Sequence, residues 1–248
     1  MPTSTQSIRE IVSTQQSAAG ILLRFDIDLC SQADESLQEA CSHLQLSVDQ
    51  VLEKLSDAED LERGVALADP TSLSLSRLSL SRLIQHIVRV HHRCARQELP
   101  RLAAMAHTLA AKRSDRAPEL KKVETFIDDL HADMLAHIQK EEQILFPFIS
   151  QMDQDSIIAY RPTHSCFDSI ARPVFTMVQE HEAAASLVEG LHRLTHGFQP
   201  PAWACATHIA LYAGLRAFEA DLKQHVHLEN DVLFPRALAM ETVLNHRG

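Results

Sequence analysis

Two pairs of residues in this sequence combine histidine with glutamate at a spacing of four. His137 precedes Glu141, and His225 precedes Glu229. Residues four apart lie on one face of a helix, so each pair could present an imidazole nitrogen and a carboxylate oxygen to one ion. Stepping along each segment by fours and threes places both pairs on a stripe whose other positions are apolar. The spacing therefore predicts metal ligands that point into a protein core.

Two further histidines lie in the middle of apolar stripes. In chain order, the four stripes are Ile84, Val88, His92, Ala95, Leu99, Leu102; Leu130, Met134, His137, Glu141, Ile144, Phe148; Ile170, Val174, Met177, His181, Ala184, Val188, Leu191; and Leu211, Leu215, Phe218, Leu222, His225, Glu229, Val232. The neighbouring line through His91 runs into Cys94 and Glu98, so His92 is the better inward candidate. The pattern predicts six inward ligands on four helices.

The spacings indicate an internal repeat. His92 precedes His137 by 45 residues, and His181 precedes His225 by 44. Each pair continues as H-x-x-x-E and ends in Leu-Phe-Pro, at residues 145–147 and 233–235. Two copies of one helical hairpin would each supply two histidines and one glutamate to a shared centre. Burying these groups without a partner would cost several kcal/mol for each unpaired ion, and a bound metal pair removes that cost.

The donor atoms limit the choice of metal. The stripes offer nitrogen and oxygen and no thiolate, which disfavours structural zinc and iron–sulfur clusters and favours two iron ions, with manganese second. Two six-coordinate irons have about 12 positions, of which the six residues and an oxo or hydroxo bridge fill about ten. About two positions stay open, which predicts a centre that binds a small ligand or loses iron.

The remaining polar residues have a simpler interpretation. Asp133 and Glu180 are each either a hydrogen-bond partner of a ligand or an ordinary polar neighbour. Single inward histidines and surface H-x-x-x-E pairs also occur without metal. The other histidines are predicted to lie at the surface or around the ligands: His43, His86, His91, His107, His131, His164, His192, His196, His208, His227 and His246.

Four long helical patterns must position these residues. They cover about 73–112, 118–147, 173–196 and 201–235, with Pro118, Pro173 and Pro201 near helix starts. With no strand signal, the fold class predicted is all-α, an antiparallel four-helix bundle. Residues 1–56 read as a small domain of short helices that start at capping boxes such as Ser7–Glu10 and Ser36–Glu39, and 57–72 as a linker before the bundle of 73–248.

Composition excludes several other classes of protein. The low count of six glycines among 248 residues argues against a sandwich, a barrel or a glycine-rich nucleotide fold, and the net charge of −10 argues against a nucleic-acid-binding surface. No apolar run reaches about 18 residues, so neither a membrane span nor a signal peptide is expected. Five scattered cysteines favour a reducing, cytoplasmic location.

Four segments resemble the hemerythrin-like domain of the iron–sulfur cluster repair di-iron proteins, the Repair of Iron Centres family. They are HIVRVHH…ELPRL from His86, HIQKEEQILFP from His137, QEHEAA from Gln179 and HVHLENDVLFPRAL from His225; RFDIDLC, residues 24–30, resembles that family's small leading domain. The resemblance implies di-iron ligands at His92, His137, Glu141, His181, His225 and Glu229, with both glutamates bridging the metals.

The resemblance implies that the protein repairs iron–sulfur clusters damaged by nitric oxide or oxidants. It would serve damaged iron–sulfur proteins by donating iron, or by binding or reducing NO. An NO or O₂ sensor or scavenger is the alternative, and a ferritin-type oxidase fits less well because histidines outnumber carboxylates here. The family's adjacent cysteine pair is reduced to Cys30 followed by Ser31, which excludes a local disulfide and leaves a homodimer linked through Cys30 open.

Overall fold

The computed structural model describes residues 2–15, 18, 21–22, 25, 27, 29, 32–67, 75–158 and 169–246. Most of these residues are helical, and the one β-bridge among them is an isolated pair, Ser7 with Ser36. The all-α class is confirmed. The chain forms two compact units, one of residues 1–69, 101–124 and 192–217, the other of residues 70–100, 125–191 and 218–248.

The first unit begins with short helices. Helices α1 (Ile8–Thr14) and α3 (Leu37–His43) start at the two predicted capping boxes, in which the Ser7 and Ser36 hydroxyls accept from backbone amides and Glu10 and Glu39 reach back. Helix α4 then runs over Val48–Leu67. Residues 57–67, assigned to a linker from their composition, are therefore helical, and the domain boundaries at 56 and 73 stay a prediction.

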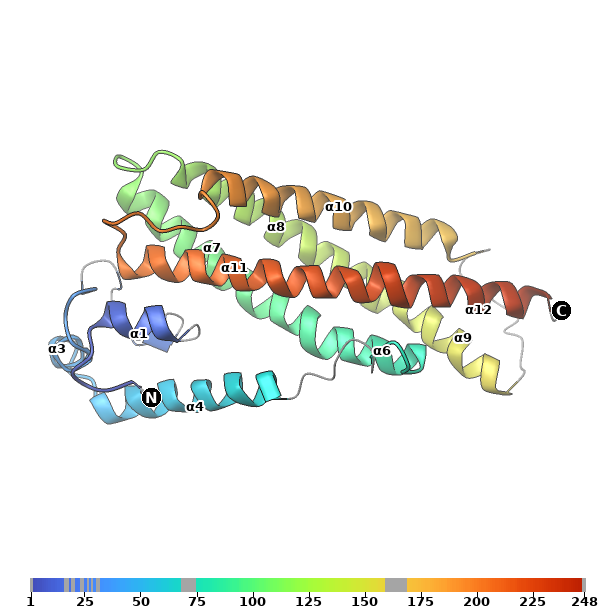
Figure 1. Ribbon diagram of the computed structural model, residues 1–248, viewed down its shortest axis with the longest axis horizontal. Coiled ribbons are helices and arrows are strands. Elements are labelled where there is room, and N and C mark those ends of the chain that lie inside the picture. The colour runs from blue at the N-terminus through green and yellow to red at the C-terminus, as the bar shows by residue number, and fades with distance from the viewer. Residues whose placement is uncertain are drawn as a thin grey trace. The chain divides into compact units, whose positions relative to one another are not determined.

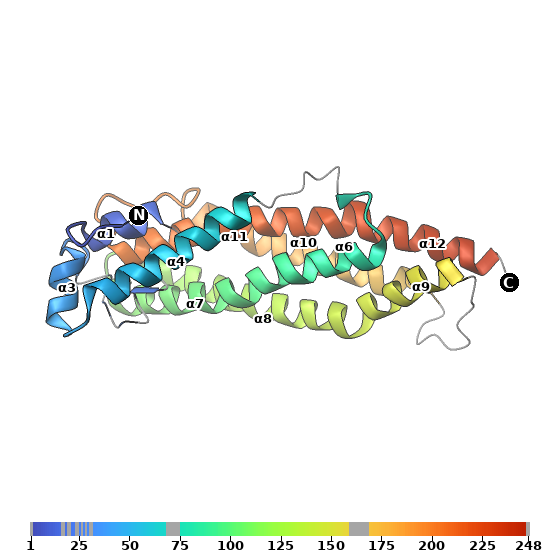
Figure 2. The ribbon, with the colours of Figure 1, turned by 90° about the horizontal axis from the view of Figure 1, so that it is seen from below.

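The second unit holds part of the predicted bundle, and the remaining parts of its long helices belong to the first unit. In it, segments of four long helices lie side by side (Figures 1 and 2). The elements, in chain order, are α6 (Leu80–Ile87), η1 (Val88–His92) and α7 (Arg93–Arg113); α8 (Leu120–Lys140), η2 (Glu141–Leu145) and α9 (Phe146–Ile158); α10 (Ala171–Leu194); and α11 (Ala206–His227), η3 (Leu228–Leu233) and α12 (Phe234–His246). Helix α6, at the start of the first, contacts α9, at the end of the second, as antiparallel packing requires.

Three of the four long helices contain a π-helical segment, η1, η2 or η3. In η2 and η3 the amides of Phe146 and Phe234 donate to the carbonyls of Glu141 and Glu229, five residues back. The wider turn leaves room for the ring of the proline that follows each phenylalanine. The prediction that the second and fourth helices end near Pro147 and Pro235 is therefore wrong, because both continue as α9 and α12.

An apolar core fills the second unit between α6, α9, α10 and α12. Its fully buried members include Leu83, Ile87, Ile149, Leu233 and Ala237. This core packs along the same helices that carry the histidine–glutamate pairs.

None of the described helices combines the length and the apolar character that a membrane span needs.

Candidate metal centre

The six predicted ligands meet inside the second unit. Each has at most 2% of its surface exposed, although all six are polar. Their donor atoms form two groups, each with every atom within 4.8 Å of the others: His92, Glu141, His225 and Glu229 in one, and His137, Glu141, His181 and Glu229 in the other. Both carboxylates belong to both groups. This is the arrangement expected of two metal positions bridged by two glutamates.

The Nε2 atoms of the four histidines face the carboxylates. His181 Nε2 lies 3.0 Å from Glu229 Oε2, and His225 Nε2 lies 3.0 Å from Glu229 Oε1. On the other side, the Nε2 atoms of His92 and His137 are each 3.3 Å from Glu141 Oε2. The histidines also face one another in pairs, His92 and His225 at 3.2 Å and His137 and His181 at 3.0 Å between Nε2 atoms.

Three of these histidines are oriented by hydrogen bonds at the opposite ring nitrogen. The Nδ1 of His92 is 2.8 Å from Glu142 Oε1, and that of His137 is 3.0 Å from Glu180 Oε2. The Nδ1 of His181 is 3.0 Å from Asn230 Oδ1. Carboxylate and amide oxygens accept, so each Nδ1 carries a proton, which leaves Nε2 as the nitrogen available to a metal. This is the tautomer that a metal ligand requires.

The inner donor set fits a cation. None of the four oxygens of Glu141 and Glu229 accepts a hydrogen bond within the described part of the chain, and all four are shielded from solvent. Two carboxyl groups and four imidazole nitrogens thus converge in one dry volume, where unsatisfied polar groups cost several kcal/mol. A metal pair would satisfy all of them, and nitrogen and oxygen donors of this kind suit iron or manganese.

Without metal, protons partly take the place of the cation charge. Burial lowers the pKa of His92, but Glu141 and Glu229 more than reverse this and raise it to about 10. Burial likewise raises the pKa of Glu229, yet His225, His181 and His92 hold it well below its ordinary value. The Glu229 carboxylate is therefore ionised and His92 is protonated at neutral pH, so a metal that bound to Nε2 of His92 would displace a proton.

The acceptors around the centre are themselves paired with surface cations. Arg96 donates to both oxygens of Glu142, at 2.8 and 3.0 Å, and Lys140 contacts Glu180 at 2.5 Å. Burial raises the pKa of Glu142 and Glu180, but the neighbouring cation and the ligand histidine outweigh it, so the pKa of each is lowered. Both acceptors are anions, which strengthens their hold on the Nδ1 protons.

A comparison with protein families and with curated proteins bears on this site. The model of the Hemerythrin HHE cation binding domain matches residues 83–237, a range that contains all six inward residues. The chain belongs to the hemerythrin family. Similarity extends beyond the domain: the "Iron-sulfur cluster repair protein YtfE" of Enterobacter sp. (strain 638) is 30% identical over 236 residues, 95% of this chain and 98% of that protein.

Other relatives with the same name agree. The YtfE proteins of Escherichia coli O1:K1 / APEC and of Escherichia fergusonii are each 29% identical over 236 residues, again 95% of this chain and 98% of theirs. The resemblance drawn from the motifs is thereby confirmed, for the hemerythrin domain and for the family of iron–sulfur cluster repair proteins.

The hemerythrin domain places most predicted residues as expected. Every member of the third stripe, from Ile170 to Leu191, is buried. In the second stripe, however, Ile144 is 49% exposed, and Leu145 is buried in its place. The cause is η2: its extra residue turns the following helix by about 100°, so later inward positions shift by one. The same shift in η3 moves burial from Val232 to Leu233.

Residues around the ligands were predicted less completely. Glu180, left open between two roles, is the Nδ1 partner of His137, whereas Asp133 is exposed. Glu142 and Asn230 were not among the predicted residues. Each directly follows the glutamate of an H-x-x-x-E pair, and this equivalent position in the two repeats could have indicated an equivalent role. His91 is buried beside the centre, with Nδ1 2.8 Å from Asp221 Oδ1.

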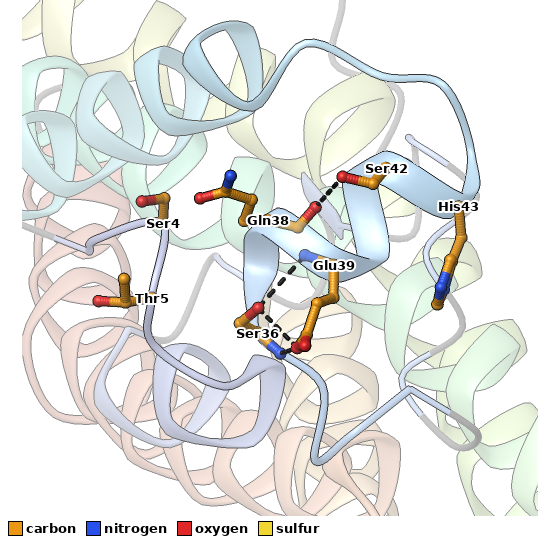
Figure 3. Close-up of a pocket in the computed structure, with 7 residues that line it drawn as sticks. All are labelled: Ser4, Thr5, Ser36, Gln38, Glu39, Ser42 and His43. Carbon is orange, nitrogen blue, oxygen red and sulfur yellow. Dashed lines mark hydrogen bonds between the residues drawn. The ribbon is translucent and has the colours of Figure 1, made fainter.

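Other candidate groups lie elsewhere. Cys30 and Ser31 are outside the described residues, and Cys41 is a buried free thiol. A surface hollow in the first unit is lined by polar residues: Ser4, Thr5, Ser36, Gln38, Glu39, Ser42 and His43 (Figure 3). The one carboxylate in this hollow, that of Glu39, accepts hydrogen bonds from the Ser36 amide and hydroxyl at the start of α3. Its role in capping this helix explains its presence without a ligand.

Proposed function

We propose that this protein repairs iron–sulfur clusters damaged by nitrosative or oxidative stress, by means of a di-iron centre. The observation that carries the proposal is the pair of four-residue groups that share both buried carboxylates. It occurs in a chain whose relatives, matched over 95% of its length, are named iron-sulfur cluster repair proteins. Similarity over that length favours repair over NO or O₂ sensing.

Six residues would hold the metals. His92 and His225 would bind one iron, His137 and His181 the other, and Glu141 and Glu229 would bridge both. The grouping of their donor atoms and the absence of thiolates among them support iron first and manganese second. When bound, iron supplies exchangeable positions for NO or O₂ and a store of metal for a damaged cluster.

The surrounding residues would keep these six in place. Glu142, Glu180 and Asn230 accept the Nδ1 protons of three ligands and so fix the orientation of their rings. The phenylalanines of the two Leu-Phe-Pro motifs cover two ligands: Phe146 is parallel to His92 at 5.5 Å between ring centroids, and Phe234 to His181 at 6.3 Å. These apolar rings cover one face of each of the two imidazoles.

The partners and location follow from the same proposal. Damaged iron–sulfur proteins would be the macromolecular partners, and NO or O₂ the small ligands. The free thiol at Cys41 supports a reducing compartment such as the cytoplasm.

Recovery of aconitase after NO treatment tests this function. The NO-damaged enzyme is incubated with the iron-loaded protein, with the iron-free protein, or with free iron at equal concentration. We expect recovery with the iron-loaded protein to exceed both controls. Recovery that does not exceed the free-iron control would contradict repair by this protein.

A further inference from the structure

The two halves of the centre differ in the residues around the ligands. The repeat relates His92 to His181 and Glu141 to Glu229, so the six inward residues match in type. The position after each bridging glutamate does not match, because it is Glu142 in the first copy and Asn230 in the second. A symmetric inner set therefore has an asymmetric surround.

These two residues occupy equivalent places in the structure. Glu142 lies 2.8 Å from the Nδ1 of His92, and Asn230 lies 3.0 Å from the Nδ1 of His181. Glu142 is an anion held by Arg96 through both of its oxygens. Asn230 offers a neutral amide oxygen, which is a weaker acceptor than a carboxylate.

The position before the first histidine of each copy also differs. Glu180 precedes His181 and binds the Nδ1 of His137 at 3.0 Å. Its counterpart, His91, lies beside His225 with the two rings parallel and 5.6 Å apart, and it contacts Asp221. Around His92 and His225 there are thus the carboxylate of Glu142, which contacts His92, and the His91–Asp221 pair beside His225; around His137 and His181 there are one carboxylate, Glu180, and one amide, Asn230.

Acceptors of this kind alter the strength of metal binding. A carboxylate that accepts the distal N–H of a histidine raises the basicity of its metal-binding nitrogen, and loss of such a partner typically costs 10–100-fold in affinity. The imidazole of His181 lacks that support, because its partner is neutral. Among the three ligands with an Nδ1 partner described here, His181 is the weakest electron donor.

We propose that the two metal positions bind iron unequally, and that Asn230 makes the position of His137 and His181 the one that releases iron first. This inference rests on the proposed di-iron centre. It identifies the position from which iron would be donated, and it assigns to Asn230 and Glu142 opposite effects on iron retention.

The rate of iron removal from the full chain tests this inference. The reduced, iron-loaded protein is mixed without oxygen with an excess of a coloured iron(II) chelator, and absorbance is followed in time. We expect a fast and a slow phase of one iron each. Asn230→Asp should slow the fast phase about ten-fold or more and leave the slow phase unchanged. Glu142→Gln should accelerate the slow phase and leave the fast phase unchanged.

A charge control and a stoichiometry control make the test specific. Asp231→Asn changes the charge next to Asn230, but Asp231 pairs with His227 at the surface, so both rates should stay as in the wild type. If the loaded wild type holds fewer than two irons, the proposed centre itself fails. If it holds two and Asn230→Asp leaves the fast rate unchanged, only the inference of unequal positions is overturned. Asn230→Asp decides the matter alone if Glu142→Gln does not fold.

Discussion

A buried histidine in the first unit should make the stability of this protein depend on pH. His208 is 1% exposed, and neither ring nitrogen has a hydrogen-bond partner within the described residues. The rings of Tyr212 and Trp203 lie 4.5 and 5.7 Å from it. Burial is the main cause that lowers the pKa of His208 to about 4; to a lesser extent, the charge of Glu119 raises this pKa and that of Arg113 lowers it.

The sign and size of the effect follow from proton linkage. The ordinary pKa of histidine is 6.5, so between pH 6.5 and about 4 the unfolded chain binds more protons than the folded one. The stability that depends on neutral His208 is therefore complete above pH 6.5 and is lost as pH falls. At about 1.4 kcal/mol per pH unit, the loss is about 2 kcal/mol at pH 5 and about 3 kcal/mol below pH 4.

Substitution with an apolar ring should remove this loss. The difference in free energy of unfolding between His208→Phe and wild type should be about 2 kcal/mol more favourable to the variant at pH 5 than at pH 7. Urea unfolding of the iron-free proteins at pH 7, 6 and 5 measures it, and the ligand histidines cancel because both proteins contain them. A difference that stays constant with pH would refute the reasoning.

Three further predictions concern the bundle. Glu229→Leu should abolish the dinuclear centre, because each iron would lose a ligand, but the protein should stay folded, because leucine suits a buried position. Elemental analysis measures the iron content, and circular dichroism measures the helical fold. His92→Ala should lose iron and His91→Ala should retain it, as metal analysis of the purified variants would show. Gly190→Ala should lower the free energy of unfolding by about 1–3 kcal/mol, measured by urea titration, because the added Cβ would lie 2.3 Å from Phe126 Cε2.

The burial and convergence of the six candidate ligands could be predicted because these residues interrupt regular patterns. A histidine or glutamate on an apolar stripe stands out, and the repeat of the pattern identifies its partners. The third stripe was right throughout, since α10 keeps a regular α-helical period from Val174 to Leu191. The choice of His92 over His91 agrees with the geometry, in which His92 and not His91 belongs to a group of four.

The rest depended on features with no period in the sequence. A π-helical segment adds one residue per turn, and the apolar pattern of 140–150 does not reveal where that residue is inserted. Ile144 was therefore predicted inward and is exposed. The Nδ1 partners Glu142 and Asn230 were missed because hydrogen bonds between helices depend on packing, which spacing along one helix does not give.

The metal content of the purified protein tests the central claim most directly. The chain is expressed in iron-replete cells, purified without chelators, and its metals are determined together with protein concentration. Six converging ligands in two groups predict two irons per chain, with oxo-to-iron charge-transfer absorption in the near ultraviolet. One zinc per chain, or iron that Glu229→Leu retains in full, would contradict the di-iron centre.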